Sequence, residues 1–126
     1  MPFNFIKRRK ILKNSNYLDL TPFKLFGEEV TEDGFVNILI PKFTNPLAVK
    51  FLTPRLKSPD IKIKLDEIGS AVWMELDGKT KVGIITKKME SKFGEKIAPV
   101  NERLTTFLTQ LYMQKYISFK ELVEKN

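Results

Sequence analysis

The stretch LDEIGSAVWMELDGK, residues 65–79, has the pattern of a capped amphipathic helix. Asp66 stands where its side chain can cap the first turn, and Gly78 suits the left-handed conformation that follows a last turn. The large apolar side chains between them recur at helical spacing and share one face: Ile68, Val72, Trp73 and Leu76. This stretch therefore predicts a helix that packs one face into a hydrophobic core.

Two more helices are predicted on the C-terminal side of this stretch. Residues 81–93 form the first, with Thr80 as its cap and Gly94 as its end. Residues 99–117 form the second, which begins at Pro99 because proline suits a first helical turn. The predicted inner faces consist of Val82, Ile85, Met89 and Phe93 in the first helix and Val100, Leu104, Phe107, Leu108 and Leu111 in the second.

Three short runs with strand character precede the helices: FVNILI at 35–40, AVKFLT at 48–53 and IKIKL at 61–65. The last run alternates strictly, with isoleucine or leucine on one face and lysine on the other. Strands first and helices after predict an α+β domain, in which a three-stranded antiparallel sheet is followed by three helices. This order is similar in outline to a winged helix-turn-helix fold.

The predicted domain spans residues 35–118. Residues 1–34 are expected to form a basic N-terminal segment and an arm that packs only partly, because Pro22 and the polar residues around it interrupt any helical pattern. Residues 119–126 are expected to form a C-terminal tail. The closing sequence SFKELVEKN fits either a short strand or a helical turn.

The chain of 126 residues contains neither cysteine nor histidine. This composition removes thiol nucleophiles, the commonest general base and the usual ligands of zinc, copper and haem. The glycine-containing stretches lack the spacing of phosphate-binding loops, and the carboxylates are interpreted as solvated faces or as partners of helix dipoles. We therefore expect a binding protein that is not an enzyme, with no cofactor, no metal and no catalytic residues.

The net charge of +7 is unevenly spread, because residues 1–13 carry five Lys and Arg and no acid. A winged-helix DNA-binding protein is one alternative, but the third predicted helix offers Asn101 and Arg103 near its start, opposed by Glu102. The connection GEKIAP is also longer than the turn of a helix-turn-helix motif, so nucleic acid is disfavoured. The sequence shows no signal-peptide pattern and no apolar run of about 18 residues, which predicts a cytoplasmic protein without a membrane span.

The stretch IKIKLDEIGSAVWMELDGKTKVGIITKKMESKFG, residues 61–94, resembles the PqqD family, which is named for pyrroloquinoline quinone biosynthesis. The family pattern is a strand that ends in Leu, an Asp or Asn cap, a helix with small residues and an aliphatic-aromatic pair, then Asp-Gly, and a second helix that ends in Phe/Tyr-Gly. The matching positions are Leu65, Asp66, Gly69, Val72, Trp73, Asp77, Gly78, Val82, Ile85, Phe93 and Gly94. RLTTFLTQLYMQKYI takes the place of the third helix, so the resemblance covers about residues 35–118.

The resemblance implies a non-catalytic adaptor, also called a recognition element for ribosomally made and modified peptides. Such domains capture the leader segment of a precursor peptide as an added strand, between their third strand and third helix. They present it to a separate modifying enzyme, often a radical S-adenosylmethionine enzyme. In this sequence the resemblance places the peptide-binding residues at Ile61, Lys62, Ile63, Lys64 and Leu65 on the strand and at Arg103, Phe107, Gln110 and Gln114 on the helix. Lys62 and Lys64 would favour an acidic peptide.

Other interpretations of the same features stay open at this point. The chain could be a structural scaffold subunit of a larger enzyme complex, and an exposed sheet edge could equally pair with a second copy to form a homodimer. The arm from Tyr17 to Phe26 could fold over that edge and occupy the groove. The sequence names neither the peptide nor the partner enzyme, and it gives no oligomeric state and no role for the basic residues within 7–13.

Overall fold

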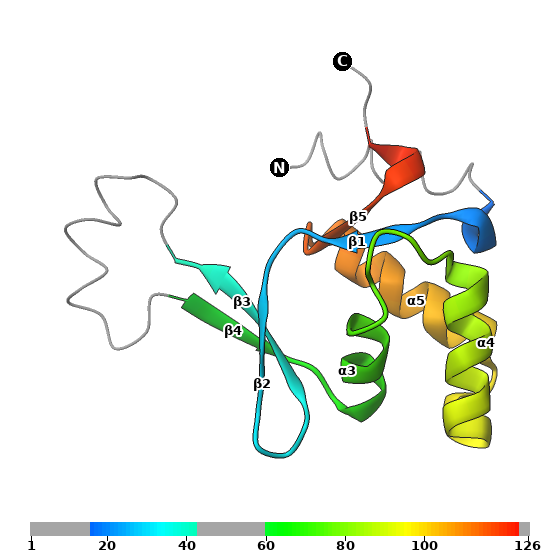
Figure 1. Cartoon of the computed structure of the whole chain (residues 1–126), viewed down its shortest axis with the longest axis horizontal. Helices are drawn as coiled ribbons and strands as arrows, with labels where there is room; N and C mark the ends of the chain where they lie inside the picture. The colour runs from blue at the N-terminus through cyan, green and yellow to red at the C-terminus, as the bar shows by residue number, and fades with distance from the viewer. Residues whose placement is uncertain (1–15, 43–59, 124–126) are drawn as a thin grey trace. The chain divides into compact units, whose positions relative to one another are not determined.

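The computed structural model describes residues 16–42 and 60–123 of the chain (Figure 1). The described residues divide into two compact units, of which the first comprises residues 16–25 and 71–123 and the second residues 26–42 and 60–70. The boundary falls within one helix, α3 (Glu67–Trp73). The second unit contains a three-stranded sheet, and the first contains two longer helices and a two-stranded sheet.

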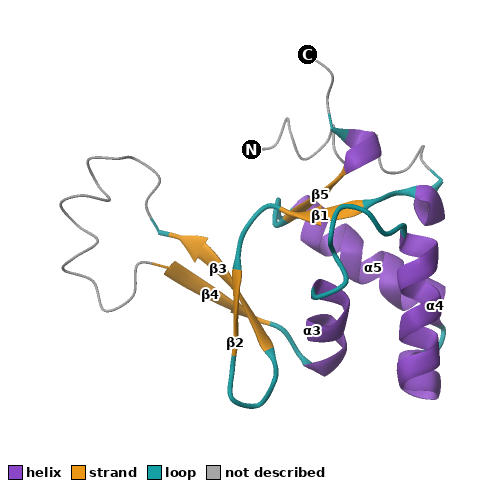
Figure 2. Ribbon diagram, in the orientation of Figure 1, coloured by secondary structure: helices purple, strands orange, loops and turns teal. Residues whose placement is uncertain are grey.

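The sheet of the second unit consists of β2 (Glu28–Val30), β3 (Val36–Pro41) and β4 (Asp60–Lys64), in the order β2-β3-β4 (Figure 2). Both pairs of neighbouring strands are antiparallel. With the three helices α3, α4 and α5 of the described residues, this sheet confirms the predicted α+β class. The winged-helix likeness stays a prediction.

The strands of this sheet agree only partly with the predicted ones. β3 and β4 correspond to the predicted strands at 35–40 and 61–65, while the strand predicted at 48–53 lies outside the described residues. The first strand of the sheet, β2, comes instead from the segment that was expected to be an arm. It is joined to β3 by a tight turn in which Gly34 adopts a φ of +84°, a conformation that glycine adopts without steric cost.

A buried serine, Ser70, forms hydrogen bonds to both β3 and the residue after β4, at the end of the sheet where β4 leads into α3. The N–H of Leu65 donates to the carbonyl of Val36 at 2.9 Å, but the N–H of Val36 donates to Ser70 Oγ at 2.8 Å. The same hydroxyl lies 3.4 Å from the carbonyl of Leu65 and donates to it. Asp66 Oδ1 accepts from the N–H of Gly69 at 2.7 Å, which confirms the predicted cap of this helix.

The first unit is built around α4 (Val82–Phe93) and α5 (Val100–Met113), which are joined by the 3-10 helix η3 (Gly94–Ile97). Its buried side chains come from both helices, from η3 between them, from α3 and from the C-terminal strand: Val72, Trp73, Val82, Ile85, Ile97, Leu104, Leu108, Tyr112, Ile117 and Phe119. Phe93 and Phe107, which were predicted to face the core, are only half-buried. The described residues include no helix that is long and apolar enough to cross a membrane.

The N-terminal arm packs onto the C-terminal segment of the same unit. Its strand β1 (Pro22–Lys24) pairs antiparallel with β5 (Ile117–Phe119). The carboxylate of Glu121, in the 3-10 helix η4 (Lys120–Leu122), accepts from both the N–H and the hydroxyl of Thr21, each at 2.7 Å. In the 3-10 helix η1 (Tyr17–Asp19), the ring of Tyr17 lies edge-on to that of Phe119, with 5.7 Å between centroids. Within the stretch from Tyr17 to Phe26, the strand-forming residues therefore pair with β5.

Two helix ends differ from the prediction. Lys81, not Thr80, is the N-cap of α4, because the Thr80 hydroxyl donates instead to Asp77 Oδ2 at 3.0 Å. α5 ends at Met113 and not near residue 117, because Lys115 takes a left-handed φ of +66° and the chain turns into β5. The C-terminal sequence thus supplies both a short strand and a helical turn, the two alternatives that the sequence left open.

Candidate functional site

The outer edge of β4 is the first surface of interest. Within the described parts of the chain, β4 pairs with β3 alone and so stands at the edge of the sheet. An edge strand presents backbone N–H and C=O groups that no neighbouring strand uses. Such groups are the means by which an extended peptide can be bound as an additional strand.

The register of the sheet identifies which residues of β4 present these groups. In an antiparallel pair, hydrogen-bonded residue pairs alternate with pairs that do not exchange backbone bonds. Leu65 bonds to Val36 across the two strands, so Ile63 and Ile61, two and four residues earlier, also direct their backbone groups toward β3. The backbone groups of Lys62 and Lys64 therefore point away from β3, toward the outer edge.

The side chains of β4 alternate between two chemically distinct faces. Ile61, Ile63 and Leu65 share one face, on which exposure falls from 49% at Ile61 to 7% at Leu65, with Ile63 half-buried. Lys62 and Lys64 share the opposite face and are both exposed. A strand added at this edge would meet an apolar row on one face and a basic row on the other.

The two lysines differ in their surroundings. Lys62 Nζ lies 3.0 Å from Glu29 Oε1, and Asn37 Nδ2 donates to the same oxygen at 3.0 Å. These two contacts, the Asn37 hydrogen bond first, hold the pKa of Glu29 below its ordinary value. Lys64 stands opposite Asn37 in the register, and no acidic side chain among the described residues forms an ion pair with it. The charge of Lys62 is thus partly offset by Glu29, whereas no carboxylate in residues 16–42 or 60–123 offsets that of Lys64.

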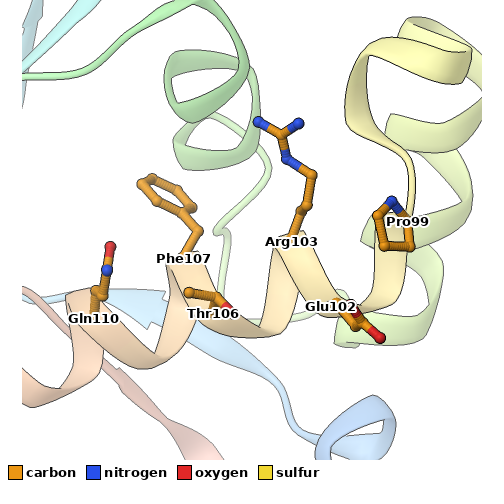
Figure 3. A pocket seen from close by; sticks show the side chains of 6 residues that line it. All are labelled: Pro99, Glu102, Arg103, Thr106, Phe107 and Gln110. Carbon is orange, nitrogen blue, oxygen red and sulfur yellow. The ribbon is translucent and has the colours of Figure 1, made fainter.

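A second surface lies along α5, in the first unit. Six side chains line an open hollow of about 390 Å³: Pro99, Glu102, Arg103, Thr106, Phe107 and Gln110 (Figure 3). Phe107 lies between Gln110 and Arg103 along the helix, and Arg103 projects beside it from one turn earlier (Figure 3). The guanidinium of Arg103 donates through Nη1 to the carbonyl of Lys96 at 3.1 Å, which holds it near the start of the helix.

The structure brings together three of the four helix residues that were predicted to bind peptide. Arg103, Phe107 and Gln110 line the hollow, because residues three and four apart share one side of a helix. Gln114 is the C-cap of α5 and does not line it. Of the five predicted strand residues, four lie in β4 and the fifth, Leu65, directly follows it in the second unit. Sequence reasoning missed Glu29, whose contact with Lys62 depends on the unpredicted strand β2, and it missed the hydrogen bond from Asn37 of β3 to the same carboxylate.

Two further carboxylates have lowered pKa values because they accept hydrogen bonds within the fold. The pKa of Asp77 is lowered because its carboxylate accepts from the N–H of Lys79 and from the hydroxyl and N–H of Thr80, in the turn before α4. Burial opposes a lowered pKa for Glu121, but the two hydrogen bonds from Thr21 outweigh it. Across residues 16–42 and 60–123, no group of three or more acidic, histidine or cysteine side chains could hold a metal ion.

Comparison with protein-family models extends this description. Residues 58–117 match the model of Coenzyme PQQ synthesis protein D, PqqD. No curated protein and no solved structure matches the chain. The matched residues include β4, α3, α4 and α5, and thus both surfaces, while the predicted domain start at residue 35 stays a prediction. Residues 58–117 of the chain are thus similar to the PqqD family.

Proposed function

We propose that this protein is a non-catalytic adaptor that binds the leader segment of a precursor peptide as an added strand on the outer edge of β4. The similarity of residues 58–117 to the PqqD family supports a part in the biosynthesis of pyrroloquinoline quinone or of other ribosomally made, modified peptides. The observation that carries the finer proposal is the position of β4 at the sheet edge, with Lys62 and Lys64 directing their backbone groups outward. The modifying enzyme that receives the peptide, with radical S-adenosylmethionine enzymes among the candidates, is the proposed second partner.

The backbone of β4 supplies only part of the binding energy that such a role needs. Lys62 and Lys64 together offer two N–H and two C=O groups, and a net gain of about 0.5–1.5 kcal/mol for each hydrogen bond gives about 2–6 kcal/mol. The loss of translational and rotational freedom on binding costs at least about 4 kcal/mol. Side-chain contacts must therefore provide most of the affinity and all of the selectivity.

We propose the hollow on α5 as a second peptide contact, to be tested independently of β4. A half-buried aromatic ring beside an arginine and a glutamine offers both apolar surface and hydrogen-bond donors to a ligand. Phe107→Ala should weaken binding of the precursor peptide. The matched control is Ile84→Ala, which shortens an exposed apolar side chain on α4. Equal affinity of the Phe107→Ala variant and the unchanged protein would remove the α5 hollow from the proposal.

The test of strand addition uses candidate precursor peptides encoded beside the gene, with NMR shifts of the β4 amides as the readout. In an added strand, alternate peptide N–H groups face β4 and the others face solvent. Two versions of a binding peptide are therefore compared, N-methylated at odd or at even positions across the bound segment. We expect one version to lose binding and the other to keep it. If both versions bind equally well, or if no candidate shifts the amides of residues 60–64, strand addition at β4 is wrong.

A further inference from the structure

We infer that β4 selects a peptide segment in which acidic and apolar residues alternate, with acidic side chains opposite Lys62 and Lys64 and apolar side chains opposite Ile61 and Ile63. This inference rests on the proposed strand addition and names the chemistry of the peptide that it would favour. It follows from the two faces of β4 and from the contacts of its two lysines.

The alternation follows from the pleat of the strand. Side chains directly opposite each other on neighbouring strands project from the same face, with about 4.5–5.5 Å between Cβ atoms. A residue opposite Lys64 therefore lies on the basic face, and the next residue of the peptide lies on the apolar face, where Ile61 is 49% exposed. Because the side-chain period is two residues, the pattern is the same for either direction of the peptide chain.

The two acidic positions are not equivalent. An acid opposite Lys64 meets a cation with no ion-pair partner in the described part of the structure. An acid opposite Lys62 competes with Glu29, which already lies 3.0 Å from the ammonium group. The position opposite Lys64 should therefore contribute more to selectivity. Removing the charge of Glu29 should raise the contribution of the position opposite Lys62.

The same lysines argue against a second copy of the chain as the occupant of this edge. In a two-fold antiparallel pairing of β4 with β4, a cross-strand axis at Ile63 places Lys62 opposite Lys64 of the other copy. An axis at Lys62 places that residue opposite its own equivalent. Like charges directly opposite each other are destabilising, and lysines on an edge strand are a common protection against self-association.

The experiment compares designed peptides by NMR titration at the β4 amides. The test peptide is Gly-Ser-Asp-Ile-Asp-Ile-Asp-Ser-Gly with blocked ends. In one control each Asp is replaced by Asn, which keeps the shape and removes the charge. In a second control, Gly-Ser-Asp-Asp-Asp-Ile-Ile-Ser-Gly, the composition and charge are kept and the alternation is lost. Two acidic cross-strand contacts predict that the test peptide binds roughly two- to thirty-fold more tightly than the Asn control, and more tightly than the grouped peptide.

Variants of the protein assign this preference to individual side chains. Lys64→Gln should reduce the preference for Asp over Asn, whereas Lys87→Gln, the same charge change at an exposed position of α4, should leave it unchanged. Glu29→Gln should increase it. A reduced preference for Asp in the Lys64→Gln variant and an increased one in the Glu29→Gln variant would each support the inference. An unchanged preference in the Lys64→Gln variant overturns it.

The outcomes also separate this inference from the proposed function. If the Asp and Asn peptides shift the β4 amides with equal affinity, selection for acidic residues is wrong while strand addition stands. If the precursor peptide shifts those amides and no designed peptide does, the alternation is again wrong and strand addition again stands. If neither the precursor nor any designed peptide shifts them, both fall.

Discussion

Replacement of Ser70 by Ala tests the connection between the sheet and α3. The Ser70 hydroxyl accepts from the N–H of Val36 at 2.8 Å and lies 3.4 Å from the carbonyl of Leu65. Both Ser70 and Val36 are almost fully buried, at 4% and 1% exposure. Ser70→Ala removes this acceptor, so the buried N–H of Val36 loses its hydrogen bond to the hydroxyl at a position with little access to water.

The expected loss of stability follows from two opposing effects. A buried donor that loses its partner costs about 1–3 kcal/mol. Alanine is a better helix former than serine, which returns up to about 0.5 kcal/mol in α3. The free energy of unfolding should therefore fall by about 0.5–3 kcal/mol, and the amide of Val36 should exchange with solvent faster than in the unchanged protein.

Urea unfolding measures this change, with the fluorescence of Trp73, the single tryptophan of the chain, and circular dichroism as the two signals. The midpoint should fall at an unchanged slope. Ser91→Ala, at an exposed position of α4, is the control and should change the free energy of unfolding by less than about 0.5 kcal/mol. If Ser70→Ala behaves like this control, the hydroxyl does not stabilise the junction between the sheet and α3, and the bridging role given to Ser70 is wrong.

Three further predictions concern the helix cap, a turn and a buried phenol. Asp66→Ala should lower the free energy of unfolding by about 1 kcal/mol because the first turn of α3 loses its cap, whereas Asp66→Asn should lower it by less in the same urea assay. Gly78→Ala should destabilise more than Gly34→Ala: both glycines have positive φ, at +74° and +84°, but a Cβ at Gly78 would lie 3.3 Å from Phe23 Cβ while Gly34 has open space. Burial raises the pKa of Tyr17 to about 12, and the hydrogen bond between its hydroxyl and that of Thr109 acts in the opposite direction. Its contribution to stability should therefore be complete below pH 10 and be lost as the pH rises toward 12, and the Tyr17 phenol should ionise late in an absorbance titration at alkaline pH.

The helices could be predicted from the sequence because their signals are local. Asp66 is a cap residue, and it caps α3. Gly94 was predicted to end the second helix, and it takes a positive φ of 56° directly after Phe93. The strict alternation of residues 61–65 likewise predicted β4, because a period of two is specific to strands.

The short strands could not be predicted because pairing, not propensity, forms them. β2 has the sequence EEV and β1 the sequence PFK, and neither is long enough to show an alternating pattern. β1 depends on β5, which lies more than ninety residues later in the chain. The end of α5 was missed for a similar reason, since the residues after Met113 resemble helix until Ile117 pairs with Lys24.

The sequence named most residues of the candidate site, but it did not reveal the contacts that these residues make. The lysines of β4 and the strip on α5 follow from periodicity and from the family resemblance. The ion pair between Lys62 and Glu29 joins residues 33 positions apart, and it required a strand that the sequence did not reveal. That contact changes the interpretation of the basic face, because it makes Lys64 the less compensated of the two cations.

The most direct test of strand addition is amide hydrogen exchange along β4, with and without a bound precursor peptide. In the free protein, the amides of Ile61 and Ile63 should exchange slowly because they bond to β3, and those of Lys62 and Lys64 should exchange fast. With saturating peptide, the two lysine amides should become protected while the isoleucine amides change little. Lysine amides that still exchange fast in the complex would contradict the claim that β4 binds the peptide through its outer edge.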